Sequence, residues 1–115
     1  MTYDVRHISG MLGLARRAGK LTIGTDQVCA AMAKKGAARP YLILVSYTAS
    51  ELTKKKVTVK SEFYGIPIRQ IMIDTQQLGR ILGKTTTPAA VAVHDEHFAE
   101  EIARSEGSVT IATKG

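Results

Sequence analysis

The feature that most constrains the fold of this chain is a regular alternation of helical and strand-like hydrophobic patterns along its length. Helices are expected where apolar residues recur every third or fourth position, and strands where short apolar runs are bounded by glycine or proline. The predicted helices lie at residues 5–19, 25–36, 50–65, 75–83 and from 95 on, and the predicted strands at 20–23, 41–45, 66–73 and 89–93. This alternation favours an α/β fold in which helices cover both faces of one sheet.

Candidate capping residues mark where the helices begin, because a side-chain oxygen there can accept a hydrogen bond from a free backbone N–H group. In the helix that follows Ser50, the apolar positions are expected to be Leu52, Val59 and Phe63. The aliphatic runs at 41–45 and 89–93 are typical of strands that are buried on both faces. The predicted N-caps are Thr25, Ser50, Thr75 and Asp95.

The length of 115 residues favours a single domain with a sizeable core. We expect this domain at residues 1–104, followed by a polar, flexible tail at 105–115. The single cysteine, Cys29, excludes an intrachain disulfide and suits a reducing compartment. A membrane-spanning run of about 18 apolar residues is absent, and the first residues lack the apolar stretch of a secretion signal. We therefore expect a cytoplasmic, monomeric protein with no membrane partner.

The charge of the chain is basic and unevenly distributed. Sixteen Lys and Arg against ten Asp and Glu give a net charge of +6. Residues 1–94 hold fourteen basic and five acidic side chains, a net +9, whereas residues 95–115 hold two and five, a net −3. A basic body favours polyanionic partners, with nucleic acid first among them, although solubility alone also explains such a charge. Two Phe, four Tyr and no Trp disfavour recognition by rows of stacked aromatics.

Three motifs that could carry catalysis have ordinary structural explanations. Residues 79–85 resemble a phosphate-binding Walker loop, but they have three residues between the glycines where four are required, and they end a helix. The acids between His94 and His97 are common at a helix N-terminus, and no further ligand cluster accompanies them. Cys29 has no activating neighbour in the sequence. We expect no enzymatic activity, no cofactor and no metal.

Other stretches are candidates for contact with nucleic acid. Residues 54–56 and Lys60 form a lysine cluster, which is either a solvated helix face or a sequence-independent contact with RNA phosphates. The stretch from Lys20 to Gln27 places Gly24 at a helix start, where free backbone N–H groups can bind a phosphate. A second stretch, 78–88, leads from a helix through a loop into the last strand. On these patterns alone, an anion site and an ordinary capped helix with a tight loop fit equally well.

Taken in order, these stretches resemble the kink-turn RNA-binding ribosomal protein superfamily of the L7Ae/L30e type, and especially its small bacterial YlxQ-like branch. The resemblance lies in residues 12–20, in Gly24 and Thr25, and in the glycines and aliphatic residues of 78–93, and it covers about residues 8–103. It implies a three-layer α/β/α sandwich with a four-stranded mixed sheet, no enzymatic activity, and binding to structured RNA.

The resemblance also implies which surfaces face the RNA. In kink-turn binders, the strand-to-helix junction enters the major groove at sheared G·A pairs, and the later helix-to-strand loop covers the flipped-out nucleotide. Gln27 matches the residue types that such binders favour at its position. Asp26 stands where they usually have Asn or Lys, and Ala30 stands where they usually have Lys. The expected RNA-binding residues are Lys20, Gly24, Thr25, Asp26, Gln27, Lys34, Arg80, Gly83, Lys84, Thr85, Thr86 and Thr87.

The resulting hypothesis is a non-catalytic, ribosome-associated protein that binds structured, kink-turn-like RNA, with rRNA as the expected target. One alternative is a protein–protein adaptor of the same fold that uses the acidic residues 95–106. Another is the RNA-recognising accessory subunit of an RNA-modifying enzyme, since the chain is too short to include a catalytic domain as well. Steep salt dependence would distinguish RNA binding from an apolar protein contact.

Overall fold

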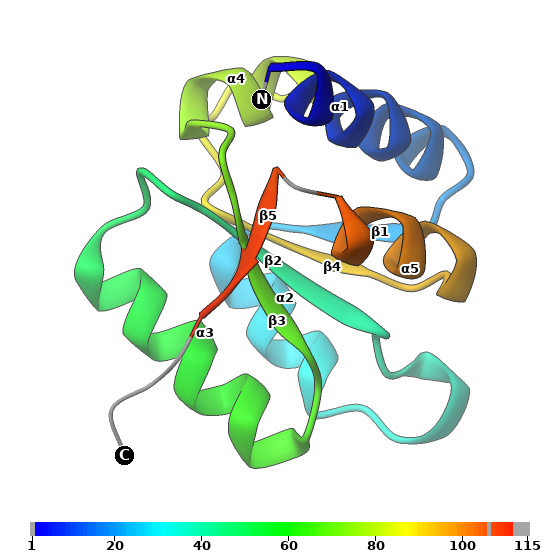
Figure 1. Ribbon diagram of the computed structural model, residues 1–115. Helices are drawn as coiled ribbons and strands as arrows, with labels where there is room; N and C mark the ends of the chain where they lie inside the picture. Colours follow the sequence, from blue (N-terminus) through cyan, green and yellow to red (C-terminus); the bar gives the residue numbers. More distant parts are fainter. Residues whose placement is uncertain (1, 106, 112–115) are drawn as a thin grey trace.

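The computed structural model describes residues 2–105 and 107–111. Figure 1 shows how helices and strands alternate along this part of the chain. None of the described helices has both the length and the apolar character needed to cross a membrane. In chain order, the elements are α1 (Thr2–Arg17), β1 (Leu21–Ile23), α2 (Thr25–Met32), the short 3₁₀ helix η1 (Gly36–Ala38), β2 (Leu42–Ser46), α3 (Glu51–Tyr64), β3 (Ile68–Ile71), α4 (Thr75–Ile81), β4 (Ala90–Val93), α5 (Glu96–Arg104) and β5 (Ser108–Thr110).

The strands form one mixed sheet in the order β1-β4-β2-β3-β5. β2 and β3 are parallel, whereas β1 with β4, β4 with β2, and β3 with β5 are antiparallel. The predicted α/β fold with a mixed sheet is therefore confirmed. The predicted number of four strands is wrong, because the described chain forms a five-stranded sheet in which β5 is the edge strand beside β3.

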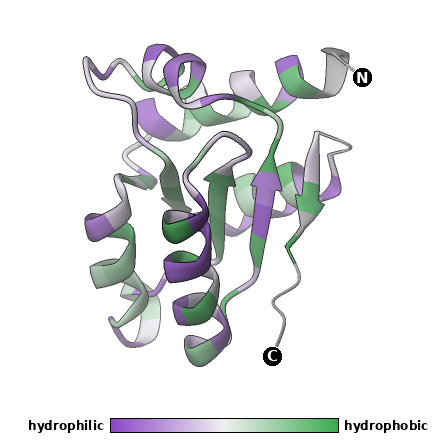
Figure 2. Cartoon of the chain, turned by 90° about the vertical axis from the view of Figure 1, so that its left-hand side faces the viewer, coloured by the Kyte–Doolittle hydropathy of each residue, from purple (hydrophilic) through white to green (hydrophobic). Residues whose placement is uncertain are grey.

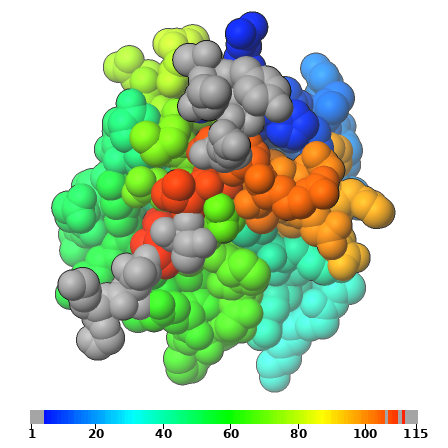
Figure 3. Space-filling model, viewed as in Figure 1, coloured from blue at the N-terminus to red at the C-terminus, as the bar shows by residue number. Residues whose placement is uncertain are grey.

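β5 lies in the segment that the sequence analysis assigned to a flexible tail. It pairs with β3 in a register that places Ser108 opposite Ile71. The Arg69 guanidinium donates from Nε and Nη2 to the hydroxyl and the carbonyl of Ser108, both at 2.8 Å. The Ser108 hydroxyl in turn donates to the carbonyl of Ile102 at 2.9 Å. The tail prediction is therefore wrong for residues 108–110, which lie beside α5 in Figure 3, while residues 106 and 112–115 lie outside the described part.

The residues of β2 show how the sheet separates two hydrophobic cores. Leu42 and Leu44 point to the face covered by α1, α4 and α5, whereas Ile43 and Val45 point to the face covered by α2 and α3. Figure 1 shows α1 and α4 above the sheet and α2 and α3 below it. In Figure 2, β2 is mainly hydrophobic, whereas its neighbour β3 has a hydrophilic middle. The arrangement is a helix–sheet–helix sandwich, and a strand that is buried on both faces needs the continuous apolar run that β2 has.

Two of the predicted N-caps are confirmed and two are wrong by one residue. Ser50 accepts from the N–H of Thr53, and Asp95 accepts from the N–H of Phe98. The N-cap of α4 is Asp74 instead of Thr75, and the N-cap of α2 is Gly24 instead of Thr25. The helix α2 also ends at Met32, earlier than the predicted closure at Gly36, which begins η1.

The apolar residues predicted for α3 do not face the core. Leu52, Val59 and Phe63 are 79%, 51% and 80% exposed. The buried face of α3 consists of Val57, Thr58 and Ser61. The two buried hydroxyls donate to carbonyls of their own helix, Thr58 to Lys54 at 2.6 Å and Ser61 to Thr58 at 2.9 Å. Because these polar groups are satisfied within the helix, they can pack against the sheet.

Candidate functional site

Several connecting segments meet at one end of the sheet, which we call the loop end. The Gly24 N–H, directly after β1, donates to the carbonyl of Ala90 at 3.0 Å. The Ser46 N–H, at the end of β2, donates to the carbonyl of Ala89 at 2.9 Å. The β1–α2 junction, the β2–α3 turn and the loop that precedes β4 therefore lie side by side, on the left of Figure 1 and toward the viewer in Figure 2.

The β1–α2 junction depends on Gly24. Its backbone has φ 107° and ψ 144°, a conformation that essentially only glycine adopts. A Cβ built at this position would press against the carboxamide of Gln27, so the Gln27 side chain folds back over Gly24. No side chain accepts a capping hydrogen bond at the start of α2. Its first backbone N–H groups are therefore available to an anion, which the helix dipole also favours.

Asp26, in the first turn of α2, forms an ion pair with Lys56 on α3. The distance from Lys56 Nζ to Asp26 Oδ1 is 3.3 Å, and the two side chains are 47% and 87% exposed. Such an exposed pair contributes little to stability, but it keeps a lysine ammonium beside the α2 N-terminus and offsets the charge of the carboxylate. The sequence analysis placed Lys56 in a lysine cluster without linking it to Asp26, and no local pattern could have revealed a contact across thirty residues.

The α4–β4 loop is packed at its base and exposed beyond it. The Lys84 N–H donates to the carbonyl of Gly79 at 2.8 Å, and a Cβ at Gly79 would lie only 2.5 Å from the carbonyl oxygen of Thr86. Gly83 has φ 66°, and a Cβ there would lie 3.1 Å from Cζ of Arg16. The Arg16 guanidinium therefore rests on this loop, which exposes Lys84, Thr85, Thr86 and Thr87.

The sequence analysis did not assign Arg16 or Tyr47 to the site. The Arg16 backbone lies beside Lys20, whose N–H donates to the Ala15 carbonyl at 2.9 Å, but its guanidinium reaches the α4–β4 loop at Gly83. Arg16 belongs to the stretch 12–20 that carried the family resemblance, but nothing in its spacing indicated a contact with Gly83. Tyr47 directly follows β2, donates its N–H to the carbonyl of Ile71 at 3.0 Å, and has a 39% exposed side chain. The position of Tyr47 could have indicated a functional residue in the sequence, because a polar residue or a glycine is more common directly after an apolar strand.

Lys20 and Lys34, two of the expected RNA-binding residues, lie away from this group. The His94 N–H donates to the carbonyl of Lys20 at 2.8 Å, which places Lys20 at the far end of β1. Three strand residues separate Lys20 from Gly24, a Cα–Cα distance of roughly 13 Å along the strand. Lys34 follows α2 at the same far end. Arg80 is exposed in the last turn of α4.

At this far end, His94 lies in a positive environment. Its Nε2 lies 2.8 Å from the Thr22 hydroxyl. Burial lowers the pKa of His94 below its usual value of 6.5, and the nearby Lys34 and Lys20 lower it further. Within the described residues, no group of three or more His, Cys, Asp or Glu side chains could hold a metal ion.

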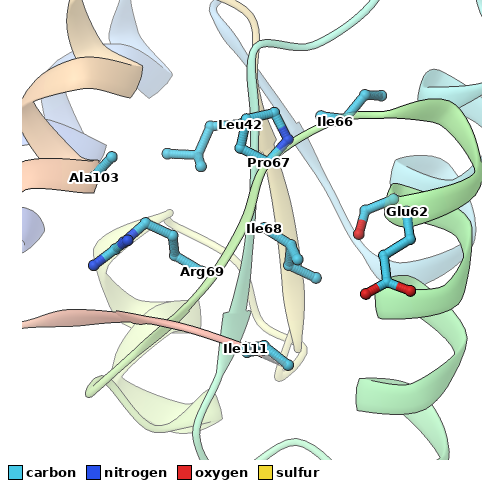
Figure 4. A pocket seen from close by; sticks show the side chains of 9 residues that line it. Leu42, Glu62, Ile66, Pro67, Ile68, Arg69, Ala103 and Ile111 are labelled. Carbon is cyan, nitrogen blue, oxygen red and sulfur yellow. The ribbon is translucent and has the colours of Figure 1, made fainter. Parts of the chain in front are cut away.

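A hollow of about 330 Å³ also lies away from the loop end, where β2 and β3 begin. Leu42 and Ile68, the first residues of these strands, line it together with Ile66, Pro67, Ala103 and Ile111. Figure 4 shows the charged side chains Glu62 and Arg69 on opposite sides of it. The hollow does not bring together any of the predicted RNA-binding residues.

The class of protein follows from the fold and the site together. It is an α/β/α sandwich with a strand-to-helix junction and a basic helix-to-strand loop side by side at one end of its mixed sheet. The chain belongs to the ribosomal protein L7Ae/L30e/S12e/Gadd45 family, whose model matches residues 6–103. The family resemblance predicted from the sequence is thus confirmed.

Individual relatives agree with this assignment. RNA-binding protein YlxQ of Bacillus subtilis is 38% identical over 92 residues, which cover 80% of this chain and 87% of the relative. RNA-binding protein YlxQ of Enterococcus faecium is 37% identical over 73 residues, 61% of this chain and 68% of the relative.

Solved structures show the same fold. A protein of unknown function from Bacillus halodurans has a TM-score of 0.73 and 33% identity, with 84% of this chain and 92% of that chain covered. The 15.5kD RNA binding protein of Giardia lamblia has a TM-score of 0.68 over 87% of this chain and 82% of that chain. At 10% identity, this second likeness shows the fold alone.

Proposed function

We propose that this chain is an RNA-binding protein that recognises structured RNA of the sharply bent, kink-turn kind through the loop end of its sheet. The observation that carries the proposal is the position of the uncapped α2 N-terminus, at Gly24, beside the exposed loop at residues 84–87. The names of the Bacillus subtilis and Enterococcus faecium relatives, which describe RNA-binding proteins, support the same partner.

Electrostatics explains why this end suits a bent RNA. A sharp bend brings phosphates close together, and a protein that binds it must offset their repulsion. At the loop end, the free N–H groups of α2 and the positive end of its dipole supply part of this compensation. The side chains of Arg16, Lys56 and Lys84 supply full charges. We expect these groups to contact phosphates, which positions the RNA without reading its bases.

We expect three other side chains of the loop end to contact the RNA bases. Asp26 can accept hydrogen bonds from base amino groups, and the amide of Gln27 can both donate and accept. Tyr47 is exposed and can stack on an unpaired base, an interaction that tolerates any base type. This small set suits a target that is recognised mainly by its shape and by a few unpaired bases.

We further propose that the RNA is ribosomal and that the protein binds it without a catalytic step of its own. The ribosomal protein family to which the chain belongs supports this target. The adaptor alternative would use the exposed acidic side chains of α5, such as Glu96 and Glu100, whereas the names of the relatives point to RNA.

The proposal is tested by measuring how affinity for a kink-turn RNA changes with salt. Lys84→Ala should weaken binding and lower the slope of log K against log salt by about 1. Lys20→Ala is the matched control, since it removes the same charge from the opposite end of β1 and should change neither quantity. If Lys20→Ala has the larger effect, the loop end is not the RNA surface.

A further inference from the structure

The outer face of α3 presents a stripe of large apolar side chains to solvent. Leu52, Val59 and Phe63 are seven and four residues apart in sequence, a spacing that returns to the same side of a helix. All are at least half exposed. The opposite side of the helix supplies Val57, Thr58 and Ser61 to the core. The hydrophobic periodicity of α3 therefore follows a face that the fold itself does not bury.

Lysines outnumber acids around this stripe, which the exposed Glu51 and Glu62 also border. Lys56 lies on the same face, one turn from Leu52, and Lys55 and Lys60 are exposed on its two sides. The Lys56 ammonium also pairs with Asp26 of α2, so the stripe begins next to the loop end and runs away from it. An exposed apolar patch with a polar rim is typical of a protein–protein interface.

We propose that this outer face of α3, formed by Leu52, Lys56, Val59 and Phe63 between Lys55 and Lys60, docks an acidic amphipathic helix of another protein. An apolar seam on the partner would cover Leu52, Val59 and Phe63, which is a helix-on-helix contact of the ordinary kind. Acidic side chains beside that seam would lie opposite the lysines, and this charge complementarity selects the partner. The inference goes beyond RNA binding, although this face shares Lys56 with the loop end.

Two other occupants fit the face less well. A second copy of this chain, packed antiparallel through α3, would place Lys56 and Lys60 of the two copies against each other, and like charges at an interface are unfavourable. An RNA strand would gain from the lysines, but of the three apolar side chains only the ring of Phe63 can stack on a base.

The test uses a synthetic, fluorescein-labelled amphipathic helix with a leucine seam and glutamates on both flanks, titrated with the full chain. A second peptide has the same seam but lysine flanks. We expect binding of the glutamate peptide and much weaker binding of the lysine peptide. The double variant Leu52→Ser and Phe63→Ser should lower the affinity for the glutamate peptide at least about tenfold. Leu14→Ser on α1, which also removes an exposed leucine, should leave that affinity unchanged.

Charge reversal and two further readouts complete the test. Lys60→Glu should weaken binding of the glutamate peptide and strengthen that of the lysine peptide. Equal binding of both peptides, or none, would overturn the proposal. A loss of kink-turn RNA affinity in Phe63→Ser would assign the stripe to RNA instead. A wild-type dimer in sedimentation that Phe63→Ser converts to monomer would assign it to a second copy, and either result would overturn the proposal.

Discussion

Replacing Gly24 by alanine should destabilise the protein, because the backbone there adopts a conformation that a side chain tolerates poorly. Its φ of 107° with ψ of 144° lies in a region that is essentially restricted to glycine, and a non-glycine residue held there costs about 1–3 kcal/mol. The added Cβ would also press on the Gln27 carboxamide. Since that carboxamide is the end of a flexible side chain, it can move aside, and we assign the expected loss of about 1–3 kcal/mol to the backbone.

Urea unfolding followed by circular dichroism measures this loss, and Gly10→Ala is the matched control. Gly10 is exposed within α1, and a Cβ built there has no atom within 4 Å. Alanine at this position should stabilise the protein by about 0.5–1 kcal/mol, because glycine is a poor helix former. The two substitutions should therefore shift the urea midpoint in opposite directions. A Gly24→Ala variant at least as stable as the wild type would refute the reasoning.

Three other outcomes are expected. Ser108→Ala should cost about 1–3 kcal/mol of stability in thermal unfolding, because it removes the hydroxyl that accepts from the Arg69 guanidinium and donates to the Ile102 carbonyl; an unchanged melting temperature would show that β5 is not held by this serine. His94 has a pKa lowered by burial and by two lysines, so its protonation favours the unfolded chain. As the pH falls below 6.5, the wild type should lose stability relative to His94→Gln, which can still hydrogen-bond to Thr22; parallel pH profiles would contradict this. The double variant Asp26→Asn and Ala30→Lys removes a negative charge and adds a phosphate partner, and should bind a kink-turn RNA several-fold more tightly in a titration at fixed salt; no gain in a folded variant would mean that this junction does not face RNA in that way.

The layers of the fold were predictable because periodicity reports burial directly. The continuous apolar run of β2 indicated a strand covered on both faces, and the structure places α1, α4 and α5 on one side and α2 and α3 on the other. β5 was not predictable in this way. Its place in the sheet rests on backbone pairing with β3 and on hydrogen bonds from Arg69 to Ser108. Such contacts between distant polar residues add little to a hydrophobic pattern.

In α3 the sequence has a clear apolar pattern, but the structure does not bury these residues in the core. Leu52, Val59 and Phe63 have ideal helical spacing, yet Thr58 and Ser61 face the sheet, where hydrogen bonds within the helix satisfy their hydroxyls. Periodicity identifies an apolar face but does not say what covers it.

The candidate site was predictable in part. The position of Gly24 at a helix start and the loop at 83–87 followed from glycine placement and from the family resemblance, and the structure brings the two segments together through Ala90. The partners Arg16 and Lys56 come from other helices, and only the three-dimensional fold reveals them. Lys20 was assigned to the site from its proximity to Gly24 in sequence, whereas in the structure the length of β1 lies between the two residues.

The most direct test of the central claim compares two RNAs with the same protein at one salt concentration. One is a hairpin with a kink-turn, and the other is a continuous duplex of the same length and nearly the same composition. Both present similar numbers of phosphates, so charge alone would bind them about equally. The account predicts that the kink-turn RNA binds at least tenfold more tightly and that an excess of the duplex does not displace it. Equal affinity for the two RNAs would contradict the claim that the loop end recognises a bent RNA.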